Sequence, residues 1–177
     1  MHKPNSALFL IDLQVGNIEH LFNSEAVINA NKQVLEWARS YAMPVFHFKY
    51  HEEQRDKRFG EPWTTEGTPE GAFHPDIQPI KTENIFTKPA YGAFSVLELN
   101  DMLKSQGIDT IWLAGVMSQV CVLATAYEAY VLKYQVNVIT DAVGATSQKN
   151  LDLGLEWMQK YVADLKSVEE FRDCLKG

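Results

Sequence analysis

Short apolar runs alternate with longer amphipathic stretches along this chain of 177 residues. The first run, residues 7–11, is apolar at every position, which is typical of a strand covered on both faces. Further strands are expected at residues 45–48, 84–88, 110–114, 136–140 and 163–166. Helices are expected at residues 24–41, 94–106, 118–134, 150–161 and 168–175, with Ser24 as the N-cap of the first. Repeated βα units predict one α/β domain over residues 1–177. The domain would have three layers in the order αβα, in a doubly wound, Rossmann-like fold with a mostly parallel central sheet of about six strands.

The distribution of charge argues against two classes of partner. The formal net charge is −7, and no basic block occurs because Arg55, Lys57 and Arg58 are interleaved with acidic residues. Nucleic acid and acidic membrane surfaces attract clustered positive charge, so we expect neither as a partner. No apolar run approaches the roughly 18 residues of a membrane span, and the N-terminal run is too short for a signal peptide. The chain is therefore expected to bind a small molecule or another protein.

The two cysteines, Cys121 and Cys174, lie far apart without CxxC spacing. This arrangement gives neither a disulfide framework nor a zinc signature. Both thiols are therefore expected to be free in a reducing compartment, the cytoplasm.

The region 51–81 lacks clear periodicity and holds four of the seven prolines. A long irregular segment inside a compact domain is unusual and often functional. We expect it to form a lid over a pocket or part of an interface.

Three chemically capable residues fall at the carboxyl ends of predicted strands, the edge at which doubly wound sheets bind their ligands. Asp12 follows the first strand, Lys88 ends the third, and Cys121 opens the helix after the fourth. Each alone has a plainer interpretation: a turn or cap residue, a solvated surface lysine, and a small buried hydrophobe. Their coincidence at one edge favours a shared active site.

The chemistry of a cysteine hydrolase fits these three residues. A thiol becomes a strong nucleophile when it loses its proton, which a helix N-terminus or a nearby cation promotes. Ser118 is expected to cap the helix, which places Cys121 in its first turn beside amides that can hold an oxyanion. Asp12 can accept the thiol proton and return it to a leaving group, while Lys88 keeps Asp12 ionised and lowers the thiol pKa.

The same residues lie in four motifs that resemble those of the isochorismatase-like family of cysteine hydrolases. The resemblance extends over nearly the whole chain. The motifs are Leu10-Ile-Asp12-Leu-Gln14, Lys88-Pro-Ala-Tyr-Gly-Ala-Phe94, Gly115-Val-Met-Ser-Gln-Val-Cys121-Val-Leu-Ala-Thr125-Ala126 and Asp141-Ala142. Each motif alone is weak, whereas four in this order are specific.

The resemblance implies a catalytic triad of Asp12, Lys88 and Cys121. It also implies a cis peptide bond between Val116 and Met117, which would direct the backbone amides of Met117 and Cys121 into one oxyanion hole. Family members commonly form dimers or larger homo-oligomers, and the same is expected of this chain.

Departures from the family pattern narrow the expected chemistry. Nicotinamidase-like members bind a metal through Asp-x-His, whereas this chain has Lys49-Tyr-His51. A cation in place of a ligating carboxylate argues against that site, so neither a metal nor another cofactor is expected. Asn17 stands where many members have an aromatic residue, and Ser118-Gln119 stands where they often have Thr-Asp. These departures leave undecided whether the pocket is polar or apolar.

The candidate substrate-binding residues are Asn17, Trp63 and Tyr91. For Trp63, simple packing of the irregular region is an equally good explanation.

Retention of Cys121 favours metal-independent hydrolysis of a small amide or ureide-like C–N bond through a thioester. True isochorismatases instead cleave a vinyl ether by proton donation from the Asp and need no thiol. Two alternatives stay open: a vinyl-ether hydrolase that uses Asp12 as its acid, and a catalytically silent binding or assembly protein of the same fold. A phospho-receiver domain is rejected because no Asp ends the third predicted strand.

Overall fold

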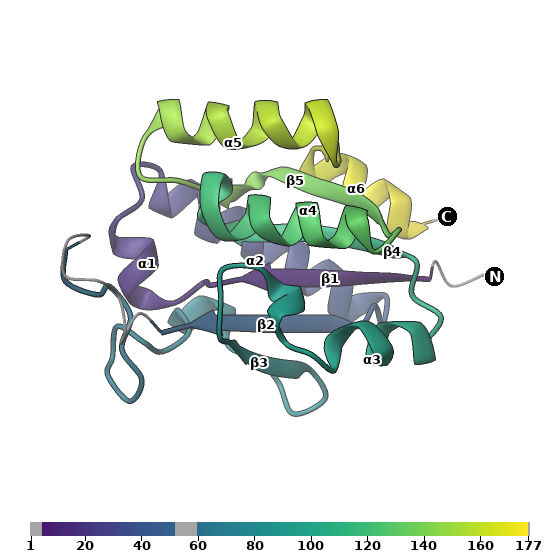
Figure 1. Cartoon of the computed structure of the whole chain (residues 1–177), viewed down its shortest axis with the longest axis horizontal. Helices are drawn as coiled ribbons and strands as arrows, with labels where there is room; N and C mark the ends of the chain where they lie inside the picture. Colours follow the sequence, from purple (N-terminus) through teal and green to yellow (C-terminus); the bar gives the residue numbers. More distant parts are fainter. Residues whose placement is uncertain (1–4, 52–59, 177) are drawn as a thin grey trace.

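The computed structural model describes residues 5–51 and 60–176 (Figure 1). Six strands form one parallel sheet in the order β3-β2-β1-β4-β5-β6. They are β1 (Ser6–Ile11), β2 (Val45–Tyr50), β3 (Asn84–Lys88), β4 (Thr110–Val116), β5 (Gln135–Gly144) and β6 (Asp164–Lys166). The chain proceeds from β1 toward one edge and from β4 toward the other, so the strand order reverses between these two central strands. Ligands bind at such a switch point in doubly wound sheets.

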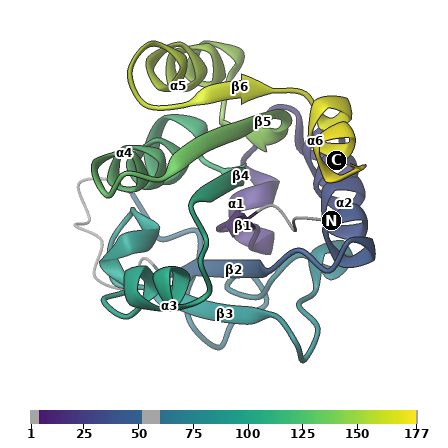
Figure 2. The ribbon, with the colours of Figure 1, turned by 90° about the vertical axis from the view of Figure 1, so that its right-hand side faces the viewer.

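The helices form two layers that enclose the sheet, which confirms the predicted three-layer α/β class. Figure 2 shows α2 and α6 on one face and α3, α4 and α5 on the other. The bounds are α1 (Val15–Glu19), α2 (Ser24–Ser40), α3 (Leu99–Ser105), α4 (Leu123–Val131), α5 (Gln148–Tyr161) and α6 (Val168–Lys176).

The continuous apolar run of β1 contributes to two separate cores. Successive side chains of a strand point to opposite faces of the sheet. Phe9 and Ile11 accordingly pack in the core beneath α3, α4 and α5, whereas Leu8 and Leu10 pack in the core beneath α2 and α6. All six residues of β1 are buried, which is why the strand shows no polar alternation in the sequence.

The structure corrects several predicted elements. The expected helix at 94–106 is split into a 3₁₀ turn, Ala93–Ser95, and α3; the expected helix at 118–134 begins as a π-helical turn, Ser118–Val122, before α4. Helix α1 was not expected, and β5 is longer than expected at both ends. Ser24 is the first helical residue rather than the N-cap of α2, and the actual N-cap, Asn23, makes no side-chain capping bond. No helix in the described ranges combines the length and apolar character needed to cross a membrane.

The described part of the irregular region packs against α1 at the carboxyl edge of the sheet. The backbone amides of Val15 and Gly16 donate to the carbonyls of Ala72 and Glu70, both at 2.9 Å. Gly16 lies so close to the Trp63 carbonyl that a Cβ there would overlap it. This segment is therefore tied to the strand end that carries Asp12. Of the expected region, residues 52–59 lie outside the described residues.

Candidate active site

Asp12 is the first residue after β1 and turns the chain away from the sheet. Its φ of 52° lies in the left-handed region, which Asp and Asn tolerate better than most side chains. Its carbonyl accepts hydrogen bonds from the Gln14 amide at 2.8 Å and from the Asn17 side chain at 3.0 Å. These bonds hold the turn, and the carboxylate is left directed into the interior, where Asp12 is 1% exposed.

Lys88 ends β3 and reaches across β2 to this carboxylate. Its Nζ donates to Oδ2 of Asp12 at 2.7 Å and to the carbonyl of Tyr91 at 2.9 Å. The Nζ also lies 5.2 Å from the ring centre of Tyr50, at the end of the intervening strand. Lys88 is 2% exposed, so the structure places a buried cation where an isolated reading of the sequence suggests a solvated one.

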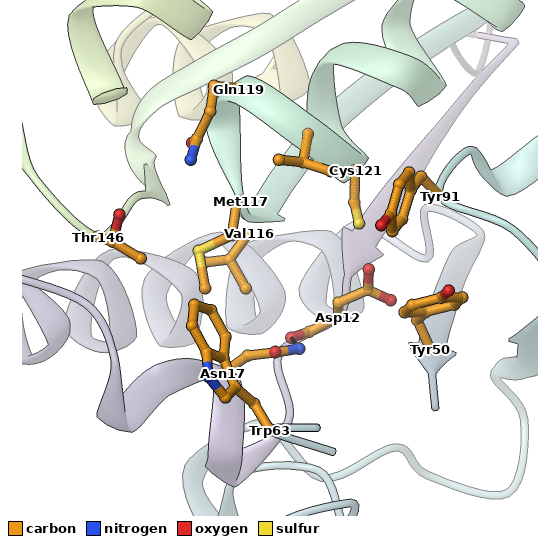
Figure 3. Close-up of a pocket in the computed structure, with 11 residues that line it drawn as sticks. Asp12, Asn17, Tyr50, Trp63, Tyr91, Val116, Met117, Gln119, Cys121 and Thr146 are labelled. Carbon is orange, nitrogen blue, oxygen red and sulfur yellow. Dashed lines mark hydrogen bonds between the residues drawn. The ribbon is translucent and has the colours of Figure 1, made fainter. Parts of the chain in front are cut away.

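Cys121 lies in the π-helical turn after β4, and its sulfur faces the Asp12 carboxylate beside the rings of Tyr50 and Tyr91 (Figure 3). Among the described residues, no hydrogen-bond partner is assigned to Oδ1 of Asp12, the oxygen that Lys88 does not hold. The carboxyl and the thiol are close enough for each to shift the pKa of the other. The structure thus brings Asp12, Lys88 and Cys121 together from three different strand ends.

Burial governs the protonation of both acidic groups. It raises the pKa of the Asp12 carboxyl above its ordinary value, although the charge and hydrogen bond of Lys88 oppose the effect. Burial also raises the pKa of the Cys121 thiol well above its ordinary value, and the nearby Asp12 charge raises it further. Lys88 and a backbone hydrogen bond from Met117 act in the opposite direction. Lys88 thus lowers the thiol pKa as expected, but burial and the Asp12 charge outweigh its effect, so that the net direction is upward.

Ser118 does not cap the helix that carries Cys121. Its hydroxyl lies 3.2 Å from the carbonyl of Asn150 and 3.3 Å from Oε1 of Gln119, within reach of either as a donor. The N-cap position belongs to Met117, and the Val116–Met117 peptide bond that precedes this turn is cis. The first turn is a π-helix with i→i+5 hydrogen bonds, whereas the predicted cap assumed the i→i+4 hydrogen bonds of an α-helix.

A pocket of about 180 Å³ opens in front of Cys121 (Figure 3). All three candidate substrate-binding residues, Asn17, Trp63 and Tyr91, line it. Trp63 is held there by stacking on His20, with ring centres 4.0 Å apart and an interplanar angle of 11°. The remaining lining residues are Asp12, Tyr50, Val116, Met117, Gln119, Val120, Cys121 and Thr146.

Among the wall residues that were not candidates from the sequence, two carry hydroxyl groups at strand ends. Tyr50 ends β2, and Thr146 follows β5. The strand-end argument that selected Asp12 and Lys88 applies equally to Tyr50 and Thr146, so their positions in the sequence could have identified them as residues of the site. Neither carries a group with obvious catalytic chemistry, which is why only the pocket itself reveals them.

The residues at the position of the family's metal site do not fit a metal. Lys49 occupies the place of the carboxylate ligand, and its Nζ lies 5.5 Å from the ring centre of Phe73. His51 lies near Asp12 and lowers the pKa of that carboxyl. Within residues 5–51 and 60–176, no group of three His, Cys, Asp or Glu side chains gathers in a metal-binding arrangement. An ammonium cannot replace an anionic ligand, so these residues do not hold a metal in the way that the Asp-x-His pair would.

Residues 6–170 match the family model for the isochorismatase domain. The chain belongs to the isochorismatase family. This isochorismatase-family hydrolase is 30% identical to the uncharacterized isochorismatase family protein YwoC of Bacillus subtilis, over 97% of this chain and 94% of the relative. It is 27% identical to Nicotinamidase 3 of Arabidopsis thaliana, over 98% of this chain and 92% of the relative. The family and the hydrolase class predicted from the motifs are confirmed.

A solved structure of a cysteine hydrolase from Pseudomonas syringae has the same fold as this isochorismatase-family hydrolase. The TM-score is 0.88 over 99% of this chain and 94% of that chain, at 15% sequence identity. At this level of identity, the comparison supports the fold rather than the activity.

Proposed function

We propose that this hydrolase cleaves the C–N bond of a small amide or ureide-like substrate through a thioester on Cys121, without a metal. The observation that carries the proposal is the buried thiol facing a carboxylate whose other oxygen is held by a buried lysine at 2.7 Å. A thiol, a base and a cation in this order are the parts that thiol-based acyl transfer requires.

In the first half-reaction, the Cys121 sulfur attacks the carbonyl carbon as Asp12 takes the thiol proton. The raised pKa of Asp12 makes it a stronger base than an exposed aspartate, which suits removal of a proton from a thiol with a raised pKa. The backbone amides of Met117 and Cys121 stabilise the oxyanion. The C–N bond then breaks, and Asp12 gives its proton to the departing ammonia or amine.

In the second half-reaction, water attacks the thioester carbonyl and Asp12 accepts a proton from this water. The C–S bond breaks, the carboxylic acid leaves, and the proton on Asp12 returns to the sulfur. Lys88 neutralises the carboxylate each time it is ionised, which limits the cost of burying that charge. The site is thereby restored with no net change in protonation.

The pocket supports a small, partly aromatic substrate. Its volume of about 180 Å³ is below the roughly 300–1,000 Å³ of sites for drug-sized ligands. Tyr50, Trp63 and Tyr91 supply flat apolar walls, while Asn17 supplies an amide. The plant relative is by its name a nicotinamidase, which favours an amide as the class of bond.

A screen for ammonia release from small amides and ureides, with nicotinamide among them, tests the proposal. Cys121→Ala is expected to abolish turnover, and acid quenching of the parent enzyme is expected to trap an acyl adduct on Cys121 by mass spectrometry. Cys174→Ala is the matched control, because Cys174 is exposed on α6. Turnover that survives in Cys121→Ala would exclude the thioester route.

Absence of ammonia release from every amide and ureide in the screen would favour the second candidate, vinyl-ether hydrolysis with Asp12 as the acid. The raised pKa of the buried Asp12 carboxyl is the observation in its favour, because a proton donor must hold its proton near neutral pH. Asp12→Asn would then abolish cleavage of a vinyl-ether substrate, whereas Cys121→Ala would not.

The assembly and the compartment stay predictions. A homo-oligomer is consistent with exposed aromatic side chains on α4 and α5, among them Tyr127, Tyr130 and Trp157. Sedimentation velocity would measure it. A reducing compartment such as the cytoplasm is consistent with the free thiols of Cys121 and Cys174.

A further inference from the structure

Helix α4, which continues from the turn that carries Cys121, holds the loop that follows Lys88. Oγ1 of Thr125 accepts a hydrogen bond from the Ala93 amide at 3.0 Å and donates one to the Cys121 carbonyl at 2.8 Å. One turn further along, Oε2 of Glu128 accepts a hydrogen bond from the Phe94 amide at 3.0 Å. Two consecutive amides at the start of the 3₁₀ turn therefore bind to one helix.

The close approach of Glu128 depends on a glycine. Gly92 has a φ of −80°, which any residue can adopt, so its backbone conformation does not explain the residue. A Cβ at this position would instead overlap the carboxylate of Glu128. The Glu128 carboxylate occupies the space that a side chain at position 92 would fill, so an added methyl group there would displace this carboxylate.

The same loop orients Lys88. The carbonyl of Tyr91, the residue before Gly92, accepts from the Lys88 Nζ at 2.9 Å, while that Nζ donates to Asp12 at 2.7 Å. A displacement of the 91–94 backbone therefore moves one of the two acceptors that fix the ammonium. Lys88 also acts electrostatically on Glu128: burial raises the pKa of the Glu128 carboxyl, and the lysine charge lowers it.

We propose that Glu128 is a positioning residue, which holds the 91–94 loop so that the Tyr91 carbonyl directs Lys88 onto Asp12. Because Cys121 and Glu128 belong to one continuous helical segment, this contact sets the distance between the nucleophile and the cation. Thr125 provides the second attachment of the loop to the same segment. The inference rests on the roles proposed above for Lys88 and Cys121.

The test is the pH dependence of Cys121 alkylation by iodoacetamide, measured by mass spectrometry in a Cys174→Ser background. This background removes the exposed second thiol. Lys88 lowers the pKa of the Cys121 thiol, so a displaced Lys88 raises it and moves the alkylation profile to higher pH. Glu128→Ala is expected to do this and to slow alkylation at neutral pH by about tenfold, because only the thiolate reacts and its fraction falls as the thiol pKa rises. Glu128→Gln keeps an oxygen that can accept from Phe94 and is expected to restore the parent profile.

Gly92→Ala provides an independent perturbation of the same contact. Its added methyl group displaces the carboxylate of Glu128, so it is expected to reproduce the shift of Glu128→Ala, and the two changes together are expected to add little. Glu156→Ala, an exposed acidic residue on α5, is the control and is expected to leave the profile unchanged.

An unchanged alkylation profile in Glu128→Ala, with or without a loss of thermal stability, would overturn the proposal. Full additivity of Gly92→Ala and Glu128→Ala would do so too. If Glu128→Ala does not fold, the profile of Gly92→Ala alone decides. The readout is a thiol reaction rather than substrate turnover, so failure of the amidase proposal in Cys121→Ala and failure of this inference are separate results.

Discussion

The Nζ of Lys88 donates a hydrogen bond of 2.7 Å to Oδ2 of Asp12, and the side chains of both residues are at most 2% exposed. The two residues are 76 positions apart, at the ends of β1 and β3, with β2 between them. Removing one partner of such a pair leaves an uncompensated buried charge, which is more costly than removing both. The pair therefore contributes to the stability of the fold and also sets the charge balance of the proposed site.

Lys88→Met is expected to lower the free energy of unfolding by about 3–5 kcal/mol. The double variant Asp12→Asn with Lys88→Met is expected to recover part of this loss, because no buried charge remains. Chemical denaturation of the four proteins of the cycle gives the coupling energy between the two side chains. Losses that simply add would show that the pair carries no net interaction.

Turnover is expected to fall on acidification at a higher pH than an exposed aspartate would give. Asp12 must be ionised to accept the thiol proton, and burial raises its pKa. Lys88→Met is expected to move the acidic limb of kcat/KM to still higher pH, because Lys88 lowers that pKa. An acidic limb that stays in place in Lys88→Met would contradict this assignment.

The contribution of Asp12 to stability is expected to change with pH in the direction opposite to that of a carboxylate whose pKa is lowered on folding. Its folded pKa lies above the unfolded value, so its contribution is fully present below the unfolded pKa and is lost as the pH rises through the folded pKa. The free energy of unfolding of the parent, relative to that of Asp12→Asn, should therefore decrease over this interval. Denaturation curves at several pH values measure the difference.

Trp63→Phe is expected to raise KM roughly tenfold with a smaller change in kcat. The indole lines the pocket and stacks on His20, whereas the thiol and its base lie on the other side of the cavity. Trp157→Phe is the matched control, since Trp157 is an exposed residue on α5. Equal KM values for the two variants would assign Trp63 to packing alone.

Ser147→Ala is expected to destabilise the protein by about 1 kcal/mol. The Ser147 hydroxyl accepts from the Asn150 amide at 3.2 Å and so caps α5. Ser24→Ala is expected to change stability by less than about 0.5 kcal/mol, because Ser24 lies inside the first turn of α2 and makes no capping bond. Thermal unfolding of the two variants in parallel tests the distinction, and equal losses would contradict it.

Much of the fold followed from local pattern. The unbroken apolar run of β1 required helices on both faces of the sheet, and the intervening amphipathic stretches required parallel crossovers. Residues at strand ends could then be assigned to one edge, which was enough to group Asp12, Lys88 and Cys121. Boundaries were less predictable: neither the π-helical turn at Ser118–Val122 nor the break before α3 has a periodic signature.

By itself, the sequence determined the α/β class, the family and the three residues that meet at the switch point, because strand periodicity and motif order are local properties of the chain. Only the tertiary structure decided the direction in which the pKa values of Asp12 and Cys121 shift, and which neighbouring residues hold the three side chains in place. The thiol pKa is raised rather than lowered because desolvation, together with the Asp12 charge, outweighs Lys88. Glu128 reaches the loop after Lys88 because two distant segments pack without a side chain at Gly92. Burial and close approach are sums over neighbours from many parts of the chain, and no local pattern contains them.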